Sequence, residues 1–118
     1  MTKQQLMQRL KEYALSYARL VLQLPYTIVN KNYADQGNRC SSSSAANYRA
    51  ACRAKSYADF VNKLKIVEEE LDESVFFLEM IGELNPAFSE PLRKLEKEGQ
   101  ELLAIIVASL KTLRLHKS

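Results

Sequence analysis

The sequence predicts an all-α protein in which four helices form one antiparallel, up-down-up-down bundle. Apolar residues recur at spacings of three and four through three long segments, which is the period of an amphipathic helix. Strand and hairpin signals are scarce, since the 118 residues include only three glycines and three prolines and no Asn-Gly or Asp-Gly pair. A chain of this length forms one domain, which we assign to residues 1–118.

The first helix is expected over residues 2–24. One face of this segment carries six large apolar side chains: Leu6, Leu10, Tyr13, Tyr17, Leu20 and Leu24. Pro25 follows at once, and a proline ends a helix because it has no N–H to donate and its ring clashes with the preceding turn.

The third and fourth helices are expected over residues 56–83 and 88–115. Ser56 is a candidate N-cap, with Asp59 three residues later as in a capping box. Asn85 and Pro86 begin the connection, and Pro91 suits the first turn of the last helix. The two apolar stripes comprise Phe60, Leu64, Val67, Leu71, Val75 or Ser74, Leu78 and Ile81, and then Leu92, Leu95, Gly99, Leu102, Ile106, Ser109 or Leu110, and Leu113.

The segment 27–55 is the least regular, because it contains Gly37, several Asn and Gln residues and four consecutive serines. Its composition alone suggests a loop or a linker. A structureless loop of about 30 residues is rare inside a compact domain, however, and three helices would leave wide apolar faces uncovered. We therefore expect a helix over 27–55 whose contact face is a flat stripe of small residues: Cys40, Ser43, Ala46 or Asn47, Ala50 and Ala54.

The composition argues against a membrane protein and against an enzyme. The longest apolar run, 102–108, is far shorter than the roughly 20 residues that span a bilayer. The N-terminus is too polar for a signal peptide, so we expect a cytoplasmic protein. Cys40 and Cys52 have no CxxC spacing and are expected to be small buried thiols. With His116 as the single histidine and no glycine-rich phosphate loop, the sequence predicts no metal, no cofactor and no catalytic activity.

Charge is distributed unevenly, although the net charge is only +3. Residues 1–57 hold nine Lys and Arg against two acidic residues, a net charge of +7. Residues 58–118 hold eight Lys and Arg against twelve acidic residues, a net charge of −4. Two interpretations stay open. The basic half meets an anionic partner, or the basic and acidic helices are neighbours that neutralise each other.

The segment 44–79 resembles a known family in two blocks of residues. The first block contains Ser44, Asn47, Tyr48, Arg49 and Ala51, and the second contains Ser56, Asp59, Phe60, Lys63, Leu64, Glu70 and Glu73. Both are similar to blocks of the bacterial four-helix-bundle proteins encoded in intervening sequences of large-subunit ribosomal RNA genes. Relatives of that family include the accessory variability determinant of diversity-generating retroelements. Ala50 stands where the family usually has glutamate, and Phe76-Phe77 stand where Tyr-Trp is common.

The resemblance implies an oligomer with a binding function. Family members form ring-shaped homo-oligomers, typically pentamers, and the retroelement relative binds nucleic acid and a reverse transcriptase through a basic surface. We therefore expect a non-enzymatic binding protein. Its expected partners are further copies of itself, RNA or DNA, and a nucleic-acid enzyme such as a reverse transcriptase. A protein–protein interaction scaffold without nucleic-acid binding is the alternative.

Two sets of residues follow as candidates. The nucleic-acid-binding set is Lys31, Arg39, Arg49, Arg53 and Lys55, of which Arg49 and Arg53 are four apart and share a helix face. The second set is a structural polar motif made of Ser44, Asn47, Tyr48, Asp59, Lys63, Glu70 and Glu73. Asn47, Tyr48, Asp59 and Lys63 are expected to form a network at the turn between the second and third helices. Glu70 and Glu73 are expected to be solvated or ion-paired, because carboxylate metal sites in bundles use Glu-x-x-His pairs.

Overall fold

Four long helices make up the chain in the computed structural model, which describes residues 1–117 and the side chains through Leu115. They are α1 (Lys3–Val21), α2 (Ile28–Ala51), α3 (Tyr57–Leu84) and α4 (Ser89–Lys117), with a short 3₁₀ helix, η1 (Pro86–Phe88), before α4. No strand occurs in residues 1–117, so the predicted all-α fold is confirmed. None of the helices over this range is long and apolar enough to cross a membrane. The side chain of His116 lies outside the described part.

Each of the first three helices begins at a hydroxyl side chain that caps it. Thr2, Thr27 and Ser56 each accept a hydrogen bond from the backbone N–H three residues later, at 3.0–3.1 Å. These bonds satisfy donors that have no partner inside the helix. The predicted cap at Ser56 is confirmed, while the Asp59 carboxylate accepts from the backbone N–H of Lys55 rather than from that of the cap.

The first two helices end earlier than predicted. α1 ends at Val21 rather than at residue 24, and α2 ends at Ala51 rather than at residue 55. In both places the chain tightens into i→i+3 bonds, from Gln23 N–H to Leu20 O and from Ala54 N–H to Ala51 O, each 3.0 Å. The helical hydrogen-bond pattern therefore stops a few residues before Pro25 and before the Ser56 cap.

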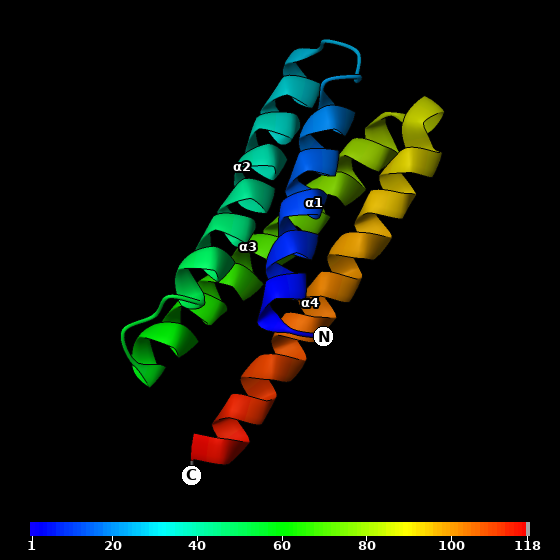
Figure 1. Cartoon of the computed structure of the whole chain (residues 1–118). Helices are drawn as coiled ribbons and strands as arrows, with labels where there is room; N and C mark the ends of the chain where they lie inside the picture. Colours follow the sequence, from blue (N-terminus) through cyan, green and yellow to red (C-terminus); the bar gives the residue numbers. More distant parts are fainter. Residues whose placement is uncertain (118) are drawn as a thin grey trace.

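The helices pack side by side in an elongated body of 48 × 21 × 20 Å (Figure 1). α2 and α4 both contact α1 and α3, and the contact between α1 and α4 is the smallest of the four. At one end, the Tyr57 hydroxyl at the start of α3 donates to the Leu113 carbonyl near the end of α4. α1 has 19 residues and α4 has 29, so α4 extends well beyond the start of α1.

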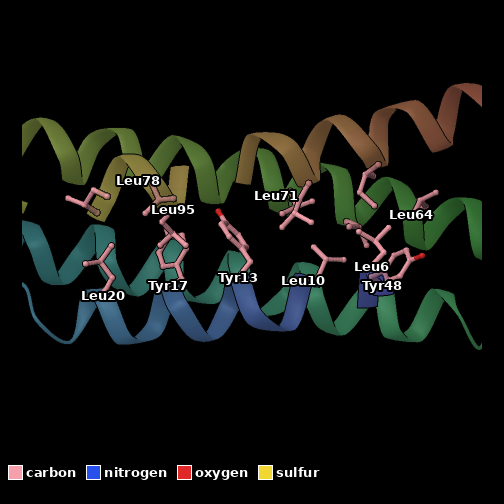
Figure 2. Close-up of a cluster of buried hydrophobic side chains, with 14 of the residues drawn as sticks. Leu6, Leu10, Tyr13, Tyr17, Leu20, Tyr48, Leu64, Leu71, Leu78 and Leu95 are labelled. Atoms are coloured by element: carbon pink, nitrogen blue, oxygen red, sulfur yellow. The ribbon is translucent and has the colours of Figure 1, made fainter. Parts of the chain in front are cut away.

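The apolar stripes of the first, third and fourth helices form the core, as their spacing predicts. Leu10, Leu71 and Leu102 are fully buried, and Leu24 and Leu113 are half-buried at the margins. Figure 2 shows side chains of α1, α3 and α4 meeting along the length of the bundle. The remaining core residues are Leu6, Tyr13, Tyr17, Leu20, Tyr48, Leu64, Val67, Leu78, Ile81, Leu92, Leu95, Ile106 and Leu110.

The buried face of α2 differs from the predicted stripe. Of the predicted residues only Cys40 is buried, whereas Ala46 is exposed and Ser43, Ala50 and Ala54 are half-buried. The observed buried face consists of Asn30, Gly37, Cys40, Ser41, Ser44, Tyr48 and Ala51. Small residues lie on every side of this helix, so their spacing alone does not select a face. The positions of two α1 tyrosines do.

Tyr13 and Tyr17 reach from α1 across the core to the middle of α3. The Tyr17 hydroxyl donates to the backbone carbonyl of Ser74 at 2.9 Å. The Ser74 hydroxyl donates to Leu71 O, so the Tyr13 hydroxyl, 2.8 Å away, donates to Ser74 Oγ. The two rings are 5.9 Å apart and nearly perpendicular, a favourable edge-to-face geometry (Figure 2).

Two glycines make room for these tyrosines. A Cβ at Gly37 of α2 would overlap the Tyr17 hydroxyl, and a Cβ at Gly99 of α4 would lie 2.6 Å from the Tyr13 hydroxyl. Only a residue without a side chain lets α2 and α4 approach α1 this closely. Gly37 therefore fixes which face of α2 is turned inward.

The first turn of α2 is tied to the end of α3 by a buried pair of amides. The Asn30 and Asn85 side chains donate to each other at 2.9 and 2.8 Å. Their remaining protons are donated to the carbonyls of Pro25 and Ile81. Every amide proton of the pair thus has a partner, which removes most of the cost of burying it.

Replacing Gly37 by alanine is expected to destabilise the protein, whereas the same change at Gly82 stabilises it. Alanine gains about 1 kcal/mol over glycine in a helix. At Gly82 no atom lies within 4 Å of the new Cβ, so that gain is retained. At Gly37 the clash with Tyr17 costs about 1–3 kcal/mol, as in other overpacked cores. Urea unfolding followed by circular dichroism measures both, and equal effects at the two sites would contradict the close approach.

Candidate functional site

A basic groove lies between α1 and α2 on the outside of the bundle. Its volume is about 690 Å³. α1 contributes Lys11, α2 contributes Arg49, and Arg53 lies in the turn after α2. The other lining residues are Gln4, Met7, Gln8, Ala45, Ala46 and Cys52. We call this surface the α1–α2 groove.

The three cations of the α1–α2 groove are not neutralised by the protein itself. No carboxylate lines the groove. The ion pairs formed among the described side chains involve Arg9, Lys31 and Lys63, and none involves a groove cation. Gln8 donates to Glu12 outside the groove at 3.0 Å. The groove is therefore a concentrated positive site that is open to an anionic ligand.

Arg9, although close to the groove in sequence, serves the opposite side of α1. Its guanidinium donates to both Glu98 carboxylate oxygens at 2.7 and 2.6 Å, and to Glu101 at 2.6 Å. The hydrogen bonds to Glu98 raise the pKa of the guanidinium above its usual range. This clamp joins α1 to α4, so Arg9 is not available to a ligand.

The structure brings only Arg49 and Arg53 of the five predicted nucleic-acid contacts together in the groove. Lys31 lies 18 residues before Arg49, about 27 Å along the helix at 1.5 Å per residue, and pairs with Asp35 at 2.7 Å. Arg39 contacts Gln36 at 3.4 Å and the Cys40 sulfur at 3.8 Å. Lys55 is exposed and lies past Arg53, outside the groove lining.

Lys11 is the groove residue that the candidate set lacks. Lys11 lines the α1 side of the groove together with Gln4 and Gln8. The three residues are spaced four and three apart, so they share one helix face opposite the apolar stripe. That spacing is the sequence signal for the groove. It identifies the face but not the helix against which the face lies.

The predicted polar motif does not form one network, and Ser44, Asn47 and Lys63 each make their side-chain contacts within a single helix. Ser44 donates to Ser41 O at 2.7 Å, and Asn47 donates to Ser43 O at 2.9 Å, all within α2. Lys63 and Asp59 form a 2.6 Å ion pair within α3. The hydrogen bond from Lys63 holds the pKa of Asp59 below its usual value. No hydrogen bond among the described side chains joins Asn47 or Tyr48 to Asp59 or Lys63, so the expected network across the turn is not formed.

Cys40, Glu70 and Glu73 form a small cluster between α2 and α3. Their potential ligand atoms all lie within 4.8 Å of one another. The Cys40 thiol is buried and donates to Glu73 Oε2 at 3.3 Å. One oxygen of Glu70 is buried without a hydrogen-bond partner among the described atoms. Burial, followed by the hydrogen bonds to Glu73 and Glu70, raises the pKa of Cys40 to about 12. The arrangement thus favours a protonated thiol as a hydrogen-bond donor, whereas a metal ligand must be a thiolate.

An apolar opening lies at the end of the bundle where α1 starts and α4 extends past it. Leu6, Tyr48, Phe60, Leu64 and Ile105 line a space of about 580 Å³ there. The Lys3 ammonium lies over the Phe60 ring, 4.8 Å from its centre. This opening exists because α1 is too short to cover the first turns of α3 and the last turns of α4 at that end.

The chain is similar in structure to a protein of unknown function from Bacteroides thetaiotaomicron, described as belonging to the S23 ribosomal protein family. The TM-score is 0.79 and the sequence identity 24%, over 90% of this chain and 98% of the other. At this identity the likeness shows a shared fold and carries no activity. No family model matches the chain, and no curated protein does.

The free energy of unfolding is expected to fall as the pH rises from about 8.5 toward 12. Unfolded cysteine and tyrosine have pKa values near 8.5 and 10, respectively. Folding raises the pKa of Cys40 to about 12 and, mainly by burial, that of Tyr48 to about 12. Burial also raises the pKa values of Tyr13 and Tyr17. Above the unfolded pKa the unfolded chain releases protons that the folded protein retains, so alkali favours unfolding.

Urea unfolding at a series of pH values measures this dependence. Cys40 alone contributes a slope of about 1.4 kcal/mol per pH unit between its two pKa values. Cys40→Ala removes this share and flattens the curve below about pH 9, where the tyrosines of the unfolded chain have barely begun to titrate. A curve that stays level from pH 8 to 11 in the unaltered protein would contradict the burial of these groups.

Proposed function

We propose that this protein is a non-enzymatic oligomeric adaptor that binds nucleic acid through the α1–α2 groove. The observation that carries the proposal is the grouping of Lys11, Arg49 and Arg53 around one groove whose described lining includes no carboxylate. Each cation that meets a phosphate releases counterions, which makes binding favourable at low salt. Flexible Lys and Arg side chains on a groove without a base-reading helix recognise the backbone rather than the sequence.

The protein would act as a ring-shaped assembly, which is implied by its resemblance to proteins encoded in ribosomal RNA intervening sequences. The S23 ribosomal protein label of the structural neighbour is consistent with a ribosomal RNA connection. In a homopentamer the groove would be repeated five times around a ring, which multiplies its positive field. The partner enzyme would be a nucleic-acid enzyme such as a reverse transcriptase, met in the cytoplasm.

An up-down-up-down, antiparallel path suits this assembly. It is supported by the Tyr57–Leu113 and Asn30–Asn85 contacts, each of which joins the beginning of one helix to the end of another. Surfaces for self-association are also present. Ile66 and Phe76 are 40% and 51% exposed on α3, and the apolar opening lies beside Phe60. Large apolar groups left in water favour association.

A protein–protein scaffold is the second candidate, and the charge of α3 favours it. Glu69, Asp72 and Glu73 are exposed on that helix, close in sequence to Phe76. This acidic surface is complementary to the α1–α2 groove, so that the groove of one copy would hold α3 of the next. Nucleic acid and the acidic helix would then compete for the same three cations.

The protein is expected to bind nucleic acid with affinity that falls steeply between about 50 and 200 mM salt, because counterion release drives the binding. Arg49→Gln with Arg53→Gln should weaken binding at least about tenfold at low salt and reduce the salt slope by about 2. Fluorescence anisotropy with a labelled duplex measures both. Unchanged helicity and oligomer size in the variant are the required control. If the variant dissociates into monomers instead, the scaffold is favoured.

Self-association is expected in the micromolar range. Light scattering should give a mass several times the 13.5 kDa of one chain, and five times if the ring is a pentamer. Phe76→Ser should shift the equilibrium toward monomer, because it removes a half-exposed apolar side chain without opening the core. A monomeric unaltered protein would contradict the assembly but leave the groove itself intact.

A further inference from the structure

The α1–α2 groove has cations on both of the helices that line it, and its other lining residues are uncharged. Lys11 stands on the α1 side, and Arg49 and Arg53 stand on the α2 side. The uncharged part of the lining includes Ala45 and Ala46 of α2, whose small side chains let a ligand approach that helix closely. A ligand that satisfies both walls must therefore carry negative charge on both of its flanks or along a narrow ridge.

The described residues that line the groove include no aromatic side chain. The aromatic residue nearest to it in sequence is Tyr48, which is only 4% exposed and whose ring belongs to the core beside Leu6 (Figure 2). Phe60 lines the apolar opening instead. Proteins that hold single strands stack the bases on exposed aromatic rings, and each stacked base contributes about 1–3 kcal/mol. The groove offers unstacked bases no such platform.

We infer that the α1–α2 groove receives the sugar–phosphate ridge of a double helix, with Lys11 as an essential third contact, and that it discriminates against single strands. This inference rests on the proposed function of the groove. A duplex keeps its bases stacked internally and presents one negative charge per 1.7 Å of axis, twice the density of one strand. It therefore gains the full electrostatic attraction of the groove and loses nothing from the missing aromatic platform.

Lys31 and Lys55 are excluded from this contact. Lys31 is neutralised by Asp35 and lies near the opposite end of α2. Lys55 is outside the lining. The groove contact thus consists of Arg49 and Arg53, which belong to the candidate nucleic-acid-binding set, and Lys11, which does not.

The experiment compares three ligands and three variants of the full chain. The ligands are a short mixed-sequence DNA duplex, one of its separate strands, and poly-glutamate as an anion without phosphate. The variants are Lys11→Gln with Arg53→Gln, Lys31→Gln with Lys55→Gln, and Lys65→Gln with Lys97→Gln. All three lower the net charge by the same amount, and Lys65 and Lys97 are exposed on α3 and α4, outside the groove. Circular dichroism and light scattering confirm that each variant is folded and assembled.

The unaltered protein should bind the duplex at least about tenfold more tightly than the single strand at equal salt, because of its charge density. Lys11→Gln with Arg53→Gln should abolish that preference and lower the salt slope by about 2, and the other two pairs should change the slope by less than 1. Equal binding of duplex and single strand would overturn the inference while leaving the proposed function in place. Tighter binding of poly-glutamate than of duplex, or no binding of either nucleic acid at low salt, would overturn both.

Discussion

The hydroxyl groups of Tyr13 and Tyr17 meet the main chain and side chain of Ser74 in the centre of the bundle, and the arrangement of the helices depends on this meeting. Each hydrogen bond contributes only about 0.5–1.5 kcal/mol, because it replaces bonds to water in the unfolded chain. A hydroxyl buried there without a partner would cost about 1–3 kcal/mol. The contact also has a steric side. Gly37 and Gly99 form the slots into which the two rings fit, and they bring α2 and α4 within reach of α1.

The α1–α2 groove is a consequence of the same register. Successive helical residues are turned by about 100°, so Lys11 points away from the core when Tyr13 points into it. In α2, Arg49 directly follows Tyr48, so Arg49 is exposed while Tyr48 is buried. The fit of Tyr17 against Gly37 fixes how α1 and α2 are turned toward each other. Lys11, Arg49 and Arg53 therefore come to line one groove. A core contact thus determines the geometry of a surface site.

Polar side chains between the helices mainly fix which helices are neighbours and how they are aligned. The Asn30–Asn85 pair attaches the first turn of α2 to the end of α3, and all of its amide protons are satisfied. The Arg9 clamp strengthens the smallest helix interface, between α1 and α4. Arg9 and Glu98 are about 30% exposed, so the clamp contributes specificity of alignment more than stability. Lys11, Arg49 and Arg53 take no part in these contacts, so a ligand can reach them.

The sequence by itself determined the all-α fold, the number of helices and the inward faces of α1, α3 and α4. Large apolar residues at helical spacing, such as Leu10, Leu71 and Leu102, have no other place than the core, so local pattern and burial agree. For α2 the pattern was ambiguous, because small residues lie on every side of the helix and their spacing selects no face. The tertiary structure decided that face, through the fit of Gly37 against Tyr17. It also decided which cations share a groove. The sequence put Lys31 and Arg49 in one candidate set because both are basic. Only the packing of α1 against α2 joins Lys11 to Arg49 and Arg53, since charges on different helices are brought together by the core between them.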